Sequence, residues 1–208
     1  MGAKSVSPDV LHAPIPYLEC PKNGEQLYNY AYEPPEGVPV SNGNPIEHDF
    51  GVTDIRVVRE QVPLTLKKHG FKLVNFAAGR AVADWADEAQ VREHYYPEVH
   101  RPRKPVWRPL AGPVDDSPLV LADASTVAPE DLMPVALHRL TYSGQTYALA
   151  HNPDHKWYWA SGITTEEAYV FACYDSRTDG RARFTPHTAF KNPSTTPDAP
   201  AKASRSEL

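Results

Sequence analysis

The chain has 208 residues, of which 41% are hydrophobic and 23% charged, as in ordinary globular domains. This composition excludes a fully disordered chain, because it supplies enough apolar surface for a core. The net charge of −5, without a clustered basic stripe, argues against nucleic-acid binding. No apolar run is long enough for a membrane span. With two cysteines and no secretory signal at the start, the sequence predicts a cytoplasmic protein.

Proline is the most unusual component, with 22 prolines against 11 glycines. Because proline cannot donate to a sheet ladder and breaks helix interiors, the regular elements must be short. This favours a β-rich fold and argues against a helix bundle. Residues 1–50 combine prolines with interleaved tyrosines, and we expect an extended arm that is ordered through aromatic contacts. The folded domain is predicted over residues 51–190, followed by a proline-rich tail over residues 191–208.

The first predicted elements alternate between strand and helix. A short strand is expected at residues 51–58, and a helical turn at residues 63–70 that begins on proline and stops on glycine. Residues 71–76 are typical of a buried strand. Residues 82–95 carry the clearest helical pattern, with Trp85 on its apolar stripe.

The second half of the sequence is typical of β structure. Residues 164–167, Thr-Thr-Glu-Glu, fit a capping box and predict one helical turn. Turn signals separate short apolar segments at roughly 8–12-residue spacing, which indicates a barrel or sandwich. The predicted strands are residues 119–121, 136–142, 146–152, 156–161 and 168–174.

Nine histidines in a β-rich chain raise the question of a metal site. A facial non-haem iron site needs two imidazoles and one carboxylate, and His-X-Asp on a strand supplies two of these on one face. No histidine in the sequence is followed by an acidic residue two positions later. Asp115-Asp116 is better explained as a turn, and Cys173 as a packing residue. The residues alone therefore predict a β-rich domain without a complete catalytic set.

Several stretches resemble the fungal AsaB-type hydroxylase/desaturase family, which are iron(II)- and 2-oxoglutarate-dependent oxygenases of secondary metabolism. The likeness begins near Gly51 and keeps the family's order. The stretches are Thr53-Asp54-Ile55-Arg56, Gly70-Phe71, Val106-Trp107-Arg108-Pro109-Leu110, residues 113–119, residues 123–127, His151-Asn152-Pro153-Asp154-His155-Lys156-Trp157-Tyr158, Tyr174-Asp175-Ser176 and Pro186-His187-Thr188-Ala189-Phe190.

The resemblance implies a mainly β fold, a double-stranded β-helix (jelly-roll, cupin-like) barrel with flanking helices. It also implies that His187 stands where the family has its distal iron ligand. Arg205 lies where the family's stretch for the 2-oxoglutarate carboxylate begins, and the chain is truncated relative to the family at this end. In the family, His-X-Asp lies between a Tyr-Tyr-Pro-Glu-like helix end and the Trp-Arg-Pro-Leu stretch. Here only residues 99–106 separate these landmarks, and they contain no His-X-Asp.

His187 would thus be a vestigial member of an incomplete triad, and three interpretations remain open. In the first, the chain is a subunit without a full iron site that pairs with an intact, iron-bearing homologue in a heterodimer, as some family members do. Fe(II) and 2-oxoglutarate would then belong to that partner, and this chain would be a pseudoenzyme. The substrate would be a hydrophobic, meroterpenoid-like natural product. The arm tyrosines and residues 157–159 are the expected interface anchors.

The second interpretation is a self-sufficient iron oxygenase that recruits ligands from His100, His151 or Asp123. The third is a non-redox enzyme of the isomerase or dehydratase type, or a small-molecule binder, on the same barrel with His187 as general base.

Overall fold

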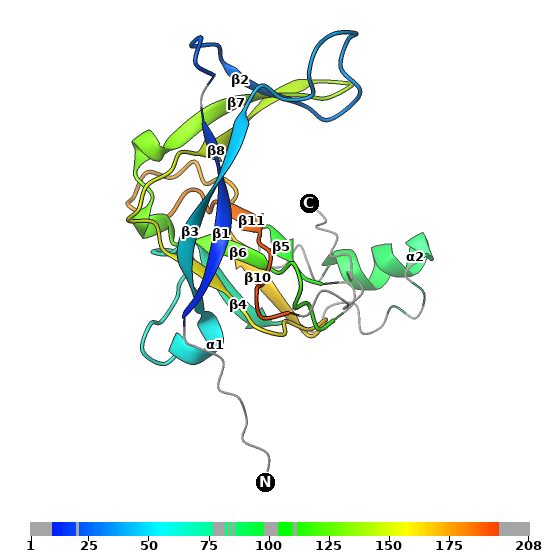
Figure 1. Ribbon diagram of the computed structural model, residues 1–208. Helices are drawn as coiled ribbons and strands as arrows, with labels where there is room; N and C mark the ends of the chain where they lie inside the picture. The colour runs from blue at the N-terminus through cyan, green and yellow to red at the C-terminus, as the bar shows by residue number, and fades with distance from the viewer. Residues whose placement is uncertain are drawn as a thin grey trace.

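The computed structural model describes residues 10–19, 21–76, 82, 84, 86–97, 104–109 and 112–195, and the described chain is mainly β (Figure 1). None of the helices within these residues is long and apolar enough to cross a membrane. The elements are β1 Val10–Glu19, β2 Leu27–Tyr30, β3 Asn44–Asp54, α1 Ile55–Val58, β4 Phe71–Asn75, α2 Glu88–Gln90, η1 Val91–Tyr95, β5 Val106–Trp107, β6 Leu119–Ala122, η2 Ala124–Thr126, η3 Pro129–Asp131, β7 Leu132–His138, β8 Ser143–Leu149, β9 Trp157–Trp159, β10 Glu167–Phe171 and β11 His187–Ala189.

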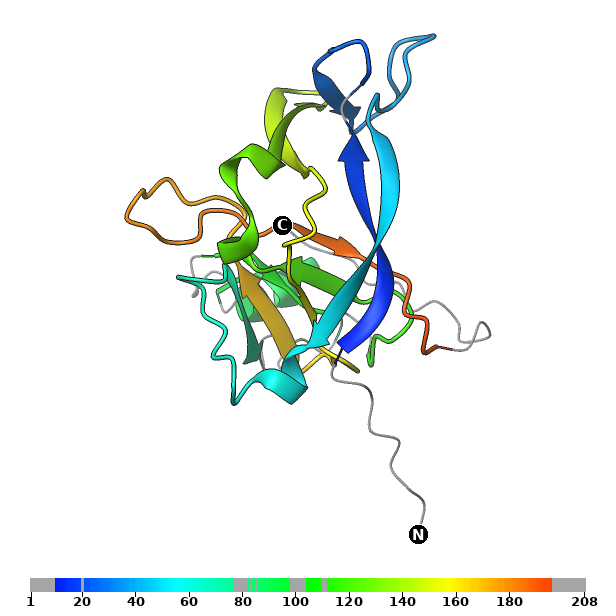
Figure 2. The same ribbon diagram turned by 60° about the vertical axis from the view of Figure 1, so that its left-hand side comes forward.

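Three sheets build the molecule as a jelly roll with short flanking helices (Figure 2). The main sheet has the order β1-β3-β9-β6-β11, in which only the β3–β9 pair is parallel. A second sheet, β4-β10-β5, faces it. The third, β2-β7-β8, lies at the top of Figure 1, away from the second sheet. The prediction of a jelly-roll barrel is confirmed.

The core follows from strand alternation in the main sheet. Leu119 and Leu121 of β6 pack with residues of the second sheet, whereas Val120 and Ala122 pack on the opposite face. Because successive side chains of a strand point to opposite faces, a strand that is buried on both sides reads as a continuous apolar run. All four residues of β6 are buried.

The proline-rich beginning of the described chain is a strand of the main sheet. β1 pairs with β3 along its full length, and its alternation buries Ile15 and Tyr17 while Pro14 and Pro16 face outward. Prolines are tolerated here because β1 is an edge strand, where the missing N–H is not needed by the ladder. β3 continues without a break through residue 50, where the sequence predicts the boundary between arm and domain. The division into arm, domain and tail stays a prediction.

The structure corrects the predicted bounds of several elements. The strand expected at residues 51–58 ends at Asp54, whose carboxylate accepts a hydrogen bond from the Arg56 amide and caps α1. The helix expected at residues 82–95 begins at Glu88 instead, because Asp87 caps it by accepting from the Ala89 and Gln90 amides. Trp85 lies outside the described residues.

Two short helical predictions are wrong. Residues 63–70 form turns, although Gly70 has the expected positive φ of 85°. At residues 164–167 the Glu167 carboxylate accepts from the Thr164 amide, as a capping box requires. The chain then enters β10 at once, so this box closes a turn.

The aromatic residues expected as interface anchors divide into two groups. Trp157 and Trp159 are only 3% and 7% exposed and pack in this chain's own core, so their expected role at an interface is corrected. Tyr17 is also buried. Tyr28 and Tyr30, in contrast, are partly exposed on the third sheet.

Candidate functional site

A cavity of about 870 Å³ opens between β1, β8 and the segment that leads into β11. Its wall is largely aromatic and aliphatic, with polar groups from the threonines near β11 and from Gln145. Pockets of this size and character suit drug-sized organic ligands. The aromatic side chains of the wall are Tyr17, Tyr147, Trp157, Tyr174 and Phe184.

His187 lies in the wall of this cavity, at the start of β11. Its Nδ1 is 2.9 Å from the Thr185 carbonyl oxygen, and because a carbonyl only accepts, Nδ1 carries the proton and Nε2 holds the lone pair of the neutral ring. The ring packs 4.7 Å from that of Phe171. A carbonyl bonded to one ring nitrogen is a common way to orient the other toward a ligand. His187 therefore offers one oriented basic nitrogen.

The described residues around His187 do not fit a facial iron site. Those that line the cavity contribute one imidazole, one thiol from Cys173, and no carboxylate. Within the described ranges, no group of three or more His, Cys, Asp or Glu side chains is placed to hold a metal ion. A facial triad needs a second imidazole and a carboxylate, so the described donors do not complete one. The sequence itself contains no His-X-Asp.

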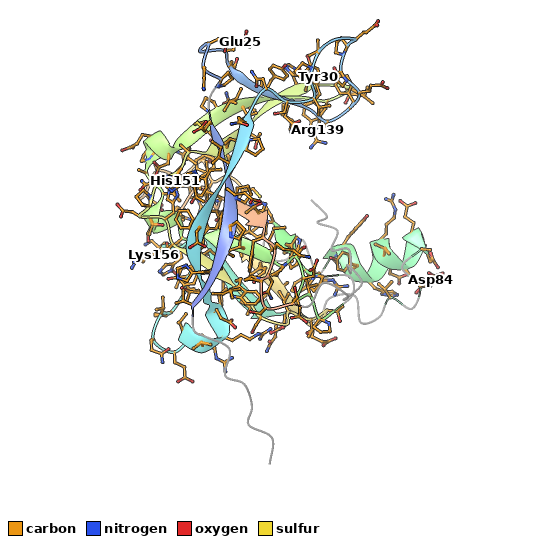
Figure 3. The ribbon with its side chains drawn as sticks, viewed as in Figure 1. Glu25, Tyr30, Asp84, Arg139, His151 and Lys156 are labelled. Atoms are coloured by element: carbon orange, nitrogen blue, oxygen red, sulfur yellow. The ribbon has the colours of Figure 1, made fainter. Side chains whose placement is uncertain are left out.

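Of the alternative ligands named for the second interpretation, the structure describes Asp123 and His151, and neither lines this cavity. Asp123 accepts hydrogen bonds from the amide and hydroxyl of Ser125 and caps η2. His151 stacks on His48, with ring centroids 3.7 Å apart, beside the β1–β3 ribbon (Figure 3). His100 and Arg205 lie outside the described residues, so their roles stay predictions.

A buried polar network that the sequence did not reveal supports the cavity wall. The Trp157 Nε1–H donates to the Tyr17 hydroxyl over 2.9 Å. The hydroxyl in turn lies 3.0 Å from His155 Nδ1, and His155 Nε2 lies 3.0 Å from Asp131. One assignment satisfies every atom, in which Tyr17 donates to His155 and His155 donates to Asp131.

Burial and hydrogen bonds together set the charges in this network. Burial alone would raise the pKa of Asp131, but the Ala128 amide, His155 and Asn152 all donate to the carboxylate, and its pKa falls below the usual value. Burial raises the pKa of Tyr17. An ionised Asp131 and a neutral Tyr17 match the network described above. Tyr17 therefore keeps its proton and serves as a wall residue held in place, because burial disfavours its ionised form.

The two aspartates of the predicted turn at residues 115–116 contact the segment that follows β11. The Asp115 carbonyl accepts from Asn192, and the Asp116 carboxylate pairs with Lys191. The Lys191 ammonium and the Ser117 hydroxyl lower the pKa of Asp116. These contacts tie the segment after β11 to the loop before β6.

Comparison with known proteins identifies the family. A family model described as "Oxidoreductase/YMDC permease-like domain" matches residues 15–104 and 105–205. The chain is 37% identical to aspirochlorine biosynthesis protein N of Aspergillus oryzae over 101 residues, which are 48% of this chain and 42% of that protein. It is 38% identical over 96 residues to the hydroxylase/desaturase efuI of Hormonema carpetanum, covering 41% of this chain and 32% of efuI.

A third relative is the Fe(II)/2-oxoglutarate-dependent dioxygenase nvfI of Aspergillus novofumigatus, 39% identical over 103 residues, which are 48% of this chain and 36% of nvfI. The chain belongs to the AsaB-type hydroxylase/desaturase family. Its relatives include the Fe(II)/2-oxoglutarate-dependent dioxygenase nvfI, the hydroxylase/desaturase efuI and a fungal biosynthesis protein. The matched regions span less than half the length of these three relatives.

Solved structures support the fold of this family member. A variant of the iron and alpha-ketoglutarate-dependent endoperoxidase NvfI has a TM-score of 0.77 and 24% sequence identity, over 93% of this chain and 94% of that chain. At this identity the likeness concerns the fold alone. The jelly roll is therefore shared with the endoperoxidase, whereas the described cavity residues do not complete an iron triad.

Proposed function

We propose that this chain is the non-catalytic subunit of a heterodimeric Fe(II)/2-oxoglutarate-dependent oxygenase of fungal natural-product biosynthesis. The observation that carries this proposal is the incomplete donor set at His187, where the cavity wall supplies one imidazole and no carboxylate from the described residues. A single imidazole does not retain Fe(II) in water. The iron and the 2-oxoglutarate would be bound by a homologous partner subunit with an intact His-X-Asp.

The proposed substrate is a hydrophobic, meroterpenoid-like compound. The apolar, aromatic wall of the cavity supports this class, because flat rings and aliphatic side chains recognise carbon skeletons with few polar groups. The family also supports it, since one relative is named for the biosynthesis of a natural product, aspirochlorine. In this proposal the chain stabilises its partner and shapes the substrate-binding surface, and carries out no chemical step.

Co-expression with an iron-bearing homologue from the same gene neighbourhood tests the proposal. We expect the two chains to copurify, and the mixture, but neither chain alone, to oxidise the substrate efficiently. Alanine in place of the partner's iron ligands should abolish turnover, whereas His187→Ala in this chain should preserve it. Full activity of this chain alone with iron and 2-oxoglutarate would overturn the proposal.

A second candidate function is favoured by the same cavity, because His187 presents an oriented basic nitrogen beside an apolar wall. A non-redox enzyme or a small-molecule binder would use this nitrogen as a base or as a hydrogen-bond acceptor. Calorimetric titration of the chain alone with the substrate separates the candidates. Tight binding that is lost in His187→Ala would favour this second function over the subunit role.

A further inference from the structure

The third sheet (β2, β7 and β8), which we call the projecting sheet, has an unusual surface. None of its strand residues is Asp, Glu, Lys or Arg, although most of β8 is exposed. Among the residues that the structure describes, the sheet and its adjoining loops also carry most of the large exposed hydrophobic side chains, including Leu140 at 82% and Tyr142 at 57% exposed. Figure 3 labels Tyr30 and Arg139 at the end of this sheet far from the body. An uncharged sheet with exposed apolar residues is typical of an interaction surface.

The outer edge of β8 has free backbone groups. Its hairpin with β7 has a continuous register without a bulge. The hairpin is closed at one end by Arg139 N–H to the Tyr142 carbonyl and at the other by Ala150 N–H to the Asp131 carbonyl. Hydrogen-bonded pairs alternate between these ends, so Ser143, Gln145 and Tyr147 point their N–H and C=O groups away from β7. The described residues form no hydrogen bond to these groups.

The other sheet edges in the described chain are protected. Pro14 and Pro16 lie on the edge strand β1, and Lys72 lies on β4. β5 and β11 are two and three residues long. The free side of β2 is covered by the loop after it, where Tyr30 N–H donates to the Val40 carbonyl. Prolines, lysines, short strands and loop cover are the usual devices against edge-to-edge pairing, and β8 has none of them.

We propose that β8 pairs edge to edge and antiparallel with β8 of a second copy of this chain. A two-fold axis places the same surface on both sides of the interface. The side chains of β8 would therefore lie opposite the same side chains of the second copy, and like charges there would repel. β8 meets this requirement because it contains no charge that would face itself. Each copy carries a net charge of −5, and the uncharged sheet is where two such copies meet with the least repulsion.

This pairing joins two projecting sheets into one continuous sheet across the two-fold axis. Gln145 and Tyr147 also line the cavity described above, so the second copy lies at the rim of each cavity. The inference does not rest on the proposed function, because it concerns two copies of this chain and needs no iron-bearing partner.

Sedimentation equilibrium of the purified full-length chain, at a series of concentrations, tests the proposal. We expect a dimer of the native chain. Gln145→Pro should dissociate it, because the Gln145 N–H points outward and its loss leaves the ladder to β7 intact. Gln145→Lys should also dissociate it by placing a charge at the edge. Each variant should raise the dissociation constant at least about tenfold.

Val57→Lys is the matched control, because Val57 is also exposed but lies on α1, outside the projecting sheet. It should leave the dimer unchanged, and circular dichroism should show all three variants folded. A native chain that remains monomeric at the highest concentration would overturn the proposal. So would a dimer that both Gln145 variants leave intact.

Discussion

Single side chains hold the cavity wall through hydrogen bonds that span long stretches of sequence. Tyr17 accepts from Trp157 and donates to His155, which Asp131 orients. All of these groups are buried. A buried donor or acceptor that loses its partner is costly, because water does not replace the lost bond.

Tyr17→Phe should therefore lower the free energy of unfolding by about 1–3 kcal/mol, since it leaves the Trp157 N–H and His155 Nδ1 without a partner. Urea denaturation followed by tryptophan fluorescence measures this. Tyr147→Phe serves as the control, because Tyr147 is 44% exposed and water can solvate its hydroxyl. Equal losses in the two variants would contradict the network.

A second prediction at this scale concerns pH. Arg56 donates two hydrogen bonds to Glu167, at 2.7 and 2.6 Å, and this contact, with the Thr164 amide, lowers the pKa of the Glu167 carboxyl below 4.5 despite burial. A lowered carboxyl pKa contributes stability above the unfolded value, and that stability is lost as the pH falls through the folded value. At neutral pH the free energy of unfolding of Glu167→Gln should be about 2 kcal/mol lower than that of the native chain.

This difference in the free energy of unfolding should shrink as the pH falls from about 5 to about 3. Chemical denaturation at a series of pH values measures it. Glu88→Gln is the matched control, since the Glu88–Arg92 pair is exposed on both sides and solvent screening leaves it with little effect on stability. A stability difference that does not change with pH would show that Glu167 does not act through its charge.

At the scale of elements, Gly70 joins three segments next to the site. It has a φ of 85°, and its carbonyl accepts from the Ala172 amide after β10 and from the Thr185 hydroxyl. Thr185 in turn holds His187 through its own carbonyl. A Cβ on Gly70 would lie 2.4 Å from the Thr185 hydroxyl oxygen. The position therefore needs glycine for both its backbone conformation and its close contact.

Gly70→Ala should destabilise the chain by about 2 kcal/mol or more, because strain at positive φ adds to a steric clash. Gly24→Ala separates these two causes, since Gly24 has a φ of 75° but open space around it. It should cost only about 1 kcal/mol. Thermal unfolding of both variants measures the difference. Equal losses of stability in the two variants would exclude a contribution from the steric clash.

At the scale of the whole molecule, the jelly roll is retained while the described donors at His187 do not complete a facial triad. The purified chain should therefore bind well below one Fe(II) per chain after anaerobic reconstitution and desalting. Metal analysis by mass spectrometry measures this, with an iron-bearing homologue as the positive control. One tightly held iron per chain, lost in His187→Ala, would instead support the second interpretation.

The sequence by itself determined the fold class, the family and the absence of a His-X-Asp motif, because these depend on local patterns. Strands 71–75 and 119–122 follow directly from short apolar runs, and the absence of His-X-Asp is a statement about neighbours two residues apart. The sequence pattern does not reveal that the helix begins at Glu88, because the apolar stripe continues upstream of Asp87, the residue that caps the helix.

Only the tertiary structure shows which strand β1 pairs with, where the cavity lies and which side chains form the buried network. Tyr17 and His155 are 138 positions apart, and His155 and Asp131 are 24 apart, so no local spacing signals their contact. Whether Trp157 faces a partner or the core likewise depends on which strand pairs with which. Pairing of β1 with β3 is a long-range choice, made by the burial of Ile15 and Tyr17, and that choice also builds one wall of the cavity.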